Sequence, residues 1–100
     1  MVFITNIIYL NPGQEQVFEE FEKVAIPIIG KYNGRMLARI RPDKDAFIEQ
    51  IIESPYEVHL CEFESEKDFQ AFLKDEGRTQ FLHMREQAIK SNILVKGERI

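Results

Sequence analysis

The sequence predicts an α+β domain in which one four-stranded antiparallel sheet carries two helices on one face. Three observations favour this class. Stretches rich in β-branched and aromatic residues alternate with two stretches whose apolar residues recur every three or four positions. Capping and turn residues separate these stretches. Their order is strand, helix, strand, strand, helix, strand, which is the split βαβ or ferredoxin-like arrangement.

Length and composition are those of one ordinary globular domain. The 100 residues suffice for a single core, so we expect one domain spanning residues 1–100. A net charge of -4 and the lack of a Lys/Arg cluster argue against nucleic acid as a partner. The single cysteine excludes an intramolecular disulfide, and no apolar run is long enough to span a bilayer. The first residues lack signal-peptide features, so we expect a cytoplasmic protein with no membrane partner.

The first strand is expected at residues 2–10, which are mostly β-branched or aromatic, and a helix is expected to follow at once. Asn11 is suited to cap this helix, Pro12 to occupy its first position and Gln14 to complete a capping box. The helix carries an apolar stripe formed by Val17, Phe21, Val24, Ala25, Ile28 and Tyr32. Its other faces are assigned the charged residues Glu15, Glu19, Glu22 and Lys23.

The end of this helix and the second strand are marked by particular residues. Pro27 cannot donate a backbone hydrogen bond and predicts a kink near it. Asn33 and Gly34 are suited to the left-handed conformation that ends a helix. Residues 35–41 alternate in polarity, which predicts the second strand, and residues 42–45 form its turn.

The third strand is predicted at residues 55–63, after a stretch at 46–52 whose three isoleucines favour an extended conformation over a helical turn. Both faces of the strand are partly apolar. One face carries Tyr56, Val58, Leu60 and Glu62, and the other carries Glu57, His59, Cys61 and Phe63. Two helices cover only one face of a sheet, so we expect a homodimer in which the sheets of two copies pack face to face.

The last third of the chain predicts a second helix and a final strand. Ser65 is expected to cap the helix, and Gly77 to interrupt it. Thr79 is suited to cap a second helical segment that carries Arg85. The last strand is expected at residues 93–97.

Three segments carry a resemblance to a known superfamily. They are VAIPIIGKYNGRMLAR, VHLCEFES and FLHMREQAIKSNILVKG, and together they resemble the dimeric α+β-barrel superfamily, most closely its domain of unknown function 1330 family. NPGQEQVFEEFEKVAIPI and EVHLCEFES also resemble the NIPSNAP family. The resemblance implies a dimeric α+β barrel and brings no secure activity with it.

A more distant resemblance concerns chemistry. Haem-degrading monooxygenases of the superfamily use an Asn on the first strand, and a Trp and an axial His on the second helix. Matching that pattern places Asn6, Phe72 and, after one inserted residue, His83 at these positions, with Phe72 in place of the Trp. Cofactor-free quinol monooxygenases are the other enzymatic relatives that the resemblance brings in.

Several residues are candidates for a site in their own right. Glu62 is expected to be partly buried and therefore to need a cation, either Arg39 or Arg85. Such an ion pair either connects the sheet to a helix or lines a ligand-binding cleft. Asn6 interrupts an otherwise apolar strand. Its side chain either hydrogen-bonds to a neighbouring backbone group or donates a hydrogen bond to a ligand oxygen. Tyr32 and Phe72 belong to the aromatic residues that line either a pocket or the core.

The histidines and the cysteine give no specific signal. His59 and His83 lie in no metal-binding spacing, so we expect neither a metal nor a cofactor, and we interpret His59 as a pocket-wall or interface residue. Cys61 shares a face with His59, but a lone Cys between apolar residues is more often a small core residue than a nucleophile.

We therefore expect a homodimeric domain that binds a small organic ligand in a cleft between sheet and helices. The alternative is a cofactor-free or haem-dependent monooxygenase acting on a small aromatic substrate. In that case Asn6, Glu62 and Arg39 are the candidate catalytic residues. The ligand-binding candidates are Tyr32, His59, Phe72, His83 and Arg85.

Overall fold

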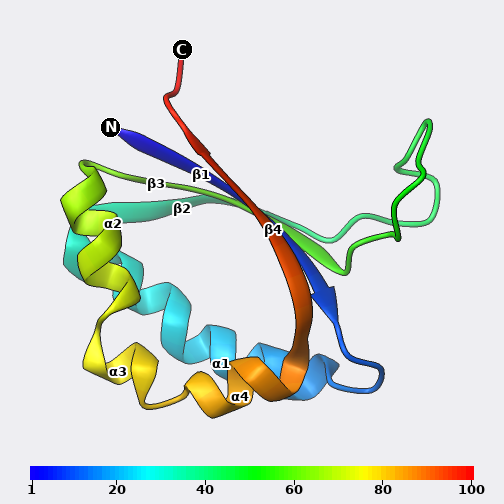
Figure 1. Cartoon of the computed structure of the whole chain (residues 1–100), viewed down its shortest axis with the longest axis horizontal. Helices are drawn as coiled ribbons and strands as arrows, with labels where there is room; N and C mark the ends of the chain where they lie inside the picture. Colours follow the sequence, from blue (N-terminus) through cyan, green and yellow to red (C-terminus); the bar gives the residue numbers. More distant parts are fainter.

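The sheet has the strand order β2-β3-β1-β4, with every neighbouring pair antiparallel, and the helices lie on one of its faces (Figure 1). This is the predicted ferredoxin-like class. The computed structural model describes all residues, 1–100. The elements are β1 Val2–Leu10, α1 Glu15–Ile28, the 3₁₀ helix η1 Ile29–Tyr32, β2 Gly34–Ile40, β3 Glu57–Phe63, α2 Glu66–Leu73, α3 Glu76–Thr79, α4 Leu82–Ala88 and β4 Ile89–Gly97.

The register of the central strand β1 decides which side chains share the helix-covered face. Asn6 lies opposite His59 of β3 on one side and opposite Leu94 of β4 on the other. Ile4 likewise lies opposite Cys61. Directly opposed residues of an antiparallel pair point to the same face, so these side chains all face the helices.

The core under the helices consists of two clusters. The larger one contains Ile4, Ile29, Cys61, Phe63 and Phe69, and the smaller one contains Ile8, Phe18 and Ala88. Both draw on β1 and on α1 or η1, which explains why the apolar stripe of the first helix is needed to close the fold.

The first helix starts later than the sequence suggests, and its predicted cap is wrong. The helix begins at Glu15, and Gly13 sits in the preceding turn with a left-handed φ of 78°. The Asn11 side chain instead donates to the carbonyl of Gln87 at 2.9 Å, and its backbone N–H donates to the carbonyl of Ala88 at 2.8 Å. Asn11 therefore joins the β1–α1 turn to the end of α4.

The end of the first helical region follows the prediction more closely. The α-helix ends one residue after Pro27 and continues as η1. Asn33 then adopts the expected left-handed conformation, with φ 57°. Gly34 does not adopt the left-handed conformation predicted for it. It is required for space instead, because a Cβ on it would lie 2.6 Å from the Phe63 ring and 2.8 Å from the Ile29 side chain.

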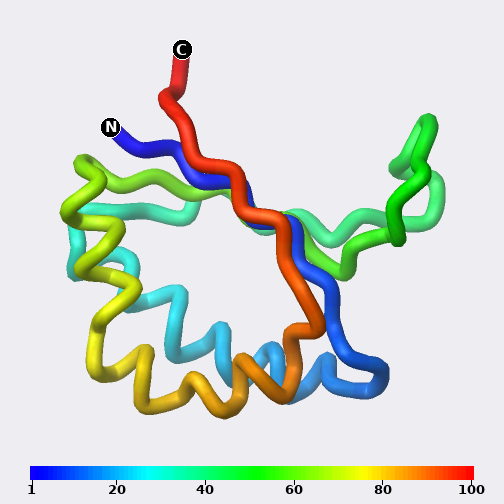
Figure 2. The backbone as a smooth tube through the Cα atoms, viewed as in Figure 1, coloured from blue at the N-terminus to red at the C-terminus, as the bar shows by residue number.

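The prediction of an extended segment at 46–52 is wrong in that no strand forms there. Residues 41–56, which we call the arm, contain neither strand nor helix and project away from the end of the sheet (Figures 1 and 2). Ile48 and Ile51 on the arm are fully exposed, at 100% and 105%. With no strand of this chain beside them, β-branched residues alone do not make a strand.

The second helical region divides differently from the prediction. Ser65 caps α2 as expected, accepting from the backbone N–H of Asp68 at 3.1 Å. The interruption lies at Asp75, whose carboxylate caps α3. Thr79 ends α3 instead of capping α4, because its hydroxyl donates back to the carbonyl of Glu76 at 3.2 Å. The last strand also begins four residues before its predicted start.

Candidate functional site

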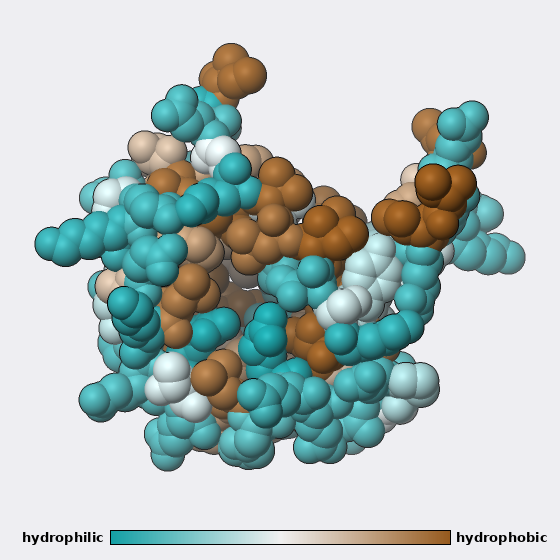
Figure 3. Space-filling model, viewed as in Figure 1, coloured by the Kyte–Doolittle hydropathy of each residue, from teal (hydrophilic) through white to brown (hydrophobic).

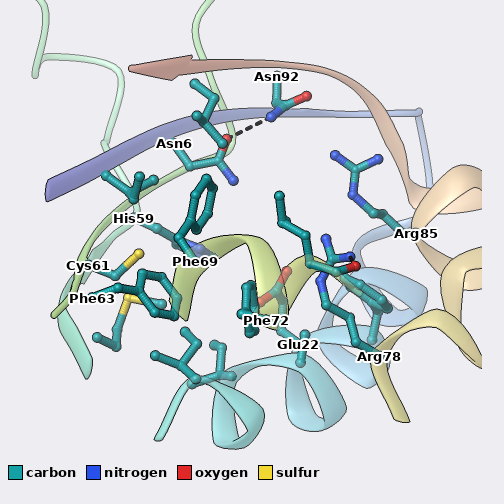
Figure 4. Close-up of a pocket in the computed structure, with 18 of the residues that line it drawn as sticks. Asn6, Glu22, His59, Cys61, Phe63, Phe69, Phe72, Arg78, Arg85 and Asn92 are labelled. Atoms are coloured by element: carbon teal, nitrogen blue, oxygen red, sulfur yellow. Dashed lines mark hydrogen bonds between the residues drawn. The ribbon is translucent and has the colours of Figure 1, made fainter. Parts of the chain in front are cut away.

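A cavity of about 130 Å³ lies between the sheet and the helices (Figure 4). This volume approaches that of an engineered protein cavity of roughly 150 Å³ that binds benzene. Figure 3 shows the corresponding hollow on the face of the molecule between β4 and the helices. Most of its lining is hydrophobic: Ile4, Phe21, Ala25, Ile26, Ile29, Met36, Cys61, Phe63, Phe69, Phe72, Leu73, Ile89 and Leu94. The polar lining residues are Asn6, Glu22, His59, Arg78, Arg85 and Asn92.

Asn6 and Asn92 form the polar part of the sheet wall. They lie on the paired strands β1 and β4, and Asn92 Nδ2 donates to Asn6 Oδ1 at 2.9 Å. In Figure 4 the amide nitrogen of Asn6 points away from Asn92 and into the cavity. Asn6 thus presents a hydrogen-bond donor to anything that occupies the cavity.

Glu22 is the functional candidate that sequence reasoning missed. Its side chain is buried, at 7% exposure, and burial raises its pKa from 4.5 to about 7, against the opposing charges of Arg39 and Arg78. No donor of this chain hydrogen-bonds to it, and no cation lies within ion-pair distance. Its spacing held a signal: Glu22 is four residues after buried Phe18 and three before buried Ala25, so it lies on the buried stripe.

Two guanidinium groups border the cavity from the last helices. Arg78 of α3 donates to the carbonyl of Leu73 at 3.2 Å and lies over the Phe72 ring, and burial lowers its pKa. Arg85 of α4 forms no ion pair. The expected pairing of Arg85 with Glu62 is therefore wrong, and in Figure 4 Arg85 extends toward the cavity.

Arg39 pairs with Glu57, and not with Glu62 as predicted. Glu57 is almost fully buried at 1% exposure, and Arg39 donates to both of its carboxylate oxygens, with contacts of 2.8 to 3.1 Å. Arg41 adds a bond of 2.6 Å, and His59 contacts the same carboxylate through Nε2. Burial alone would raise the pKa of Glu57, but the hydrogen bonds from His59, Arg41 and Arg39 outweigh it and hold the pKa below its usual value.

His59 lies between this carboxylate and the cavity. Burial lowers its pKa more than the Glu57 carboxylate raises it, so the ring is neutral near pH 7. Its Nε2–H then donates to Glu57, and Nδ1 is left as an acceptor. His59 is thus a pocket-wall residue, as the sequence suggests, with its ring orientation fixed by Glu57.

Glu62 is buried as predicted, at 3% exposure, but on the opposite face of the sheet from the cavity. Arg35 lies opposite it on β2 and donates to Oε1 at 2.6 Å. Its Oε2 has no hydrogen-bond partner, and Arg99 is 3.8 Å away. Glu62 and Arg39, two of the three candidate catalytic residues, therefore do not line the cavity.

The remaining candidates divide between cavity and surface. Phe72 lines the cavity. Tyr32 does not, and its hydroxyl donates to Asp75 at 2.5 Å, which holds the pKa of Asp75 below its usual range. His83 is exposed and its ring stacks on Phe81, so it does not line the cavity. Burial raises the pKa of Cys61 to about 11, which agrees with a core thiol.

The structure contains neither a cluster of metal-binding side chains nor a helix that could cross a membrane. Three or more His, Cys, Asp or Glu side chains do not gather anywhere in a group able to hold a metal ion. None of the helices has both the length and the apolar character needed to cross a bilayer.

Comparison with known proteins identifies the fold. The chain matches no protein-family model and no curated protein. Among solved structures, a putative antibiotic biosynthesis monooxygenase from Nitrosomonas europaea matches with a TM-score of 0.76 at 10% identity, over 100% of this chain and 99% of that chain. An uncharacterised NIPSNAP domain protein from Burkholderia xenovorans matches with a TM-score of 0.69 at 11% identity, over 100% and 95%.

A third solved structure shares the same fold. It is a dimeric protein of unknown function and ferredoxin-like fold from Bacteroides fragilis NCTC 9343, with a TM-score of 0.71 at 13% identity, over 98% of this chain and 95% of that chain. At such identities the likeness shows the fold alone, and it confirms the ferredoxin-like prediction. The resemblance to the domain of unknown function 1330 family stays a prediction from the sequence.

Proposed function

We propose that this protein binds a small, largely apolar organic molecule in the cavity between sheet and helices. The observation that carries the proposal is the composition of the cavity wall, which is mostly aromatic and aliphatic with a few polar side chains. Small-molecule sites have this composition, because apolar contacts supply affinity and a few polar groups fix orientation. Asn6 Nδ2 and Arg85 have donors without partners inside the chain, which a bound molecule would engage.

Binding can be tested with benzyl alcohol, a neutral probe of suitable size, by ¹H–¹⁵N NMR titration. We expect shifts concentrated at cavity-lining residues, and at least tenfold weaker binding in Ala25→Leu, which fills part of the cavity. Ala46→Leu is the matched control, because it adds the same atoms on the exposed arm. The proposal is wrong if the probe does not bind at millimolar concentration, or if Ala25→Leu binds it as the wild type does.

A second copy of the chain is the proposed partner on the outer face of the sheet. This face carries the exposed apolar residues Ile93, Val95 and Ile40, at 43%, 55% and 46% exposure. Figure 3 shows apolar surface over β4 and on the side of the arm that faces it. The dimeric Bacteroides protein of the same fold supports a homodimer here. The single domain and the cytoplasmic location remain predictions from the sequence.

Analytical ultracentrifugation at micromolar concentration tests the dimer. We expect a dimer for the wild type and for Gln16→Lys, an exposed change on α1, and a monomer for Ile93→Lys. A wild-type monomer at 10 µM, or a dimer that withstands Ile93→Lys together with Val95→Lys, contradicts the sheet-to-sheet assembly.

Cofactor-free oxidation of an aromatic substrate is the second candidate function. Two observations favour it: Glu22 has a pKa of about 7, suited to a general base, and Asn6 offers a donor for an oxyanion. The likeness to the Nitrosomonas protein supports the same class. A quinol and O₂ would give a hydroxyquinone and water: the substrate loses four electrons, one oxygen atom of O₂ enters the ring, and the other leaves as water.

Oxygen consumption with a quinol substrate tests this second function. We expect turnover to fall at least tenfold in Glu22→Gln and in Asn6→Ala, and full activity in Asn6→Ala would refute it. The haem alternative does not fit this geometry, because His83 does not line the cavity.

A further inference from the structure

We propose that the cavity is selective for a small carboxylic acid with an apolar body, whose carboxylate pairs with Arg85, and that binding is coupled to proton uptake by Glu22. This inference rests on the proposed ligand-binding function of the same cavity. It adds the chemical class of the ligand and the dependence of affinity on pH.

The charge on the cavity wall is the first reason. Arg78 and Arg85 contribute two positive charges, Glu22 contributes one carboxylate, and His59 is neutral near pH 7. Arg78 already donates to a backbone carbonyl, whereas Arg85 has no ion-pair partner. A guanidinium presents paired donors that match the two oxygens of a carboxylate, so Arg85 is the natural anchor for an acid.

The size and composition of the cavity define the rest of the ligand. A volume of about 130 Å³ accommodates one ring or a short branched chain. Phe63, Phe69 and Phe72 pack closely, with Phe63 5.3 Å from each of the other two ring centroids. In Figure 4 Phe63 and Phe69 lie on the opposite side of the cavity from Arg85, and Phe72 lies between them and Arg78. A benzoate-sized acid would therefore place its ring among the aromatic residues and its carboxylate toward α4.

Burial and the neighbouring charges together decide the pH at which Glu22 holds its proton. Arg39 from β2 and Arg78 from α3 stabilise its carboxylate, while Glu57 from β3 and Glu19 on its own helix destabilise it. The neutral His59 from β3 and Arg85 from α4 are the other ionisable groups that line the cavity, together with the polar Asn6 and Asn92. Burial outweighs the attraction and raises the pKa of Glu22 to about 7.

A second carboxylate in this small cavity would repel an ionised Glu22, so the anion binds best when Glu22 is protonated. Reciprocally, the bound anion increases the affinity of Glu22 for its proton. If only the protonated form binds the anion, affinity falls about tenfold between pH 6 and pH 8, and about half a proton is taken up per ligand at pH 7. A neutral ligand has no such requirement.

Isothermal titration calorimetry with benzoate and benzyl alcohol tests the inference, because the two probes share a ring and differ in charge. At pH 6 we expect the wild type to bind benzoate at least tenfold more tightly than benzyl alcohol. Arg85→Gln should weaken benzoate binding at least tenfold more than benzyl alcohol binding and so abolish this preference, whereas Arg99→Gln, on the other face of the sheet, should keep it. Titration in two buffers of different ionisation enthalpy measures the proton uptake, which Glu22→Gln should reduce to zero.

The outcomes separate the inference from the proposed function. Binding of benzyl alcohol with equal or weaker binding of benzoate overturns the acid selectivity and leaves the ligand-binding function intact. Benzoate affinity that does not change between pH 6 and pH 8 overturns the coupling to Glu22. Failure of both probes to bind overturns the proposed function, and the inference with it.

Discussion

Replacing Glu22 with Gln should make the protein less dependent on pH and more stable at alkaline pH. Glu22 is buried without a hydrogen-bond donor, and its pKa rises from 4.5 to about 7 on folding because burial disfavours the charged form. The native state thus binds this proton more tightly than the unfolded chain does. The stabilisation is therefore complete below pH 4.5 and is lost as the pH rises through about 7.

The expected magnitude follows from the two pKa values. One pKa unit corresponds to about 1.4 kcal/mol, so the whole difference amounts to about 3 kcal/mol, most of it lost between pH 5 and pH 8. Gln does not titrate and keeps the shape of the protonated side chain. The free energy of unfolding of Glu22→Gln, minus that of the wild type, should therefore increase by about 2 to 3 kcal/mol from pH 5 to pH 8.

Urea unfolding followed by circular dichroism at pH 5, 6, 7 and 8 measures this difference at a fixed protein concentration. The pKa of His59 is lowered by burial, and because His59 is present in both proteins the subtraction removes its own contribution. The exposed Glu20 of the same helix, changed to Gln, is the control and should give a difference near zero. A flat difference for Glu22→Gln, within about 0.5 kcal/mol, would refute the account of Glu22.

Three further predictions concern the fold that holds the cavity, and urea unfolding checks each of them. Gly34→Ala should lower the free energy of unfolding by about 1 to 3 kcal/mol, because there is no room for the added Cβ. The control Gly97→Ala, where the Cβ enters open space, should change it by less than about 0.5 kcal/mol. Equal effects of the two substitutions would count against the packing at Gly34. Ser65→Ala should cost about 1 kcal/mol through loss of the α2 cap, and no loss would mean the cap contributes little. Arg39→Ala should lower the free energy of unfolding by about 2 kcal/mol, because the buried Glu57 carboxylate loses hydrogen bonds. An unchanged free energy would show that Arg41 and His59 are enough to stabilise this carboxylate.

The order of strands and helices could be predicted from the sequence, because polarity patterns and turn residues are local signals. Ser65 and Asn33 are examples: each acts through its own backbone neighbourhood, and each behaves as predicted. The conformation of the arm could not be predicted, because an isoleucine-rich segment forms a strand only beside a partner strand, which the local sequence does not specify.

The site was predictable only in part, because it depends on register and on helical phase. Asn6 and Phe72 line the cavity as their positions suggest. The cation partners of the buried carboxylates depend on strand pairing: Arg35 lies opposite Glu62, and a register shift between Met36 and Ala38 precedes Arg39. Glu22 was placed outside the apolar stripe of its helix, although its spacing from Phe18 and Ala25 puts it among the buried residues.

The most direct test of ligand binding in the cavity is a set of intermolecular NOEs between the ring protons of benzyl alcohol and the methyl groups of the protein. The account predicts NOEs to Ile4, Met36 and Leu73, which line the cavity, at pH 6 and with methyl-labelled protein. It predicts none to Ile48 on the arm or Ile93 on the outer face of the sheet. NOEs confined to Ile48 or Ile93, or none to any cavity methyl at saturating probe, would contradict it.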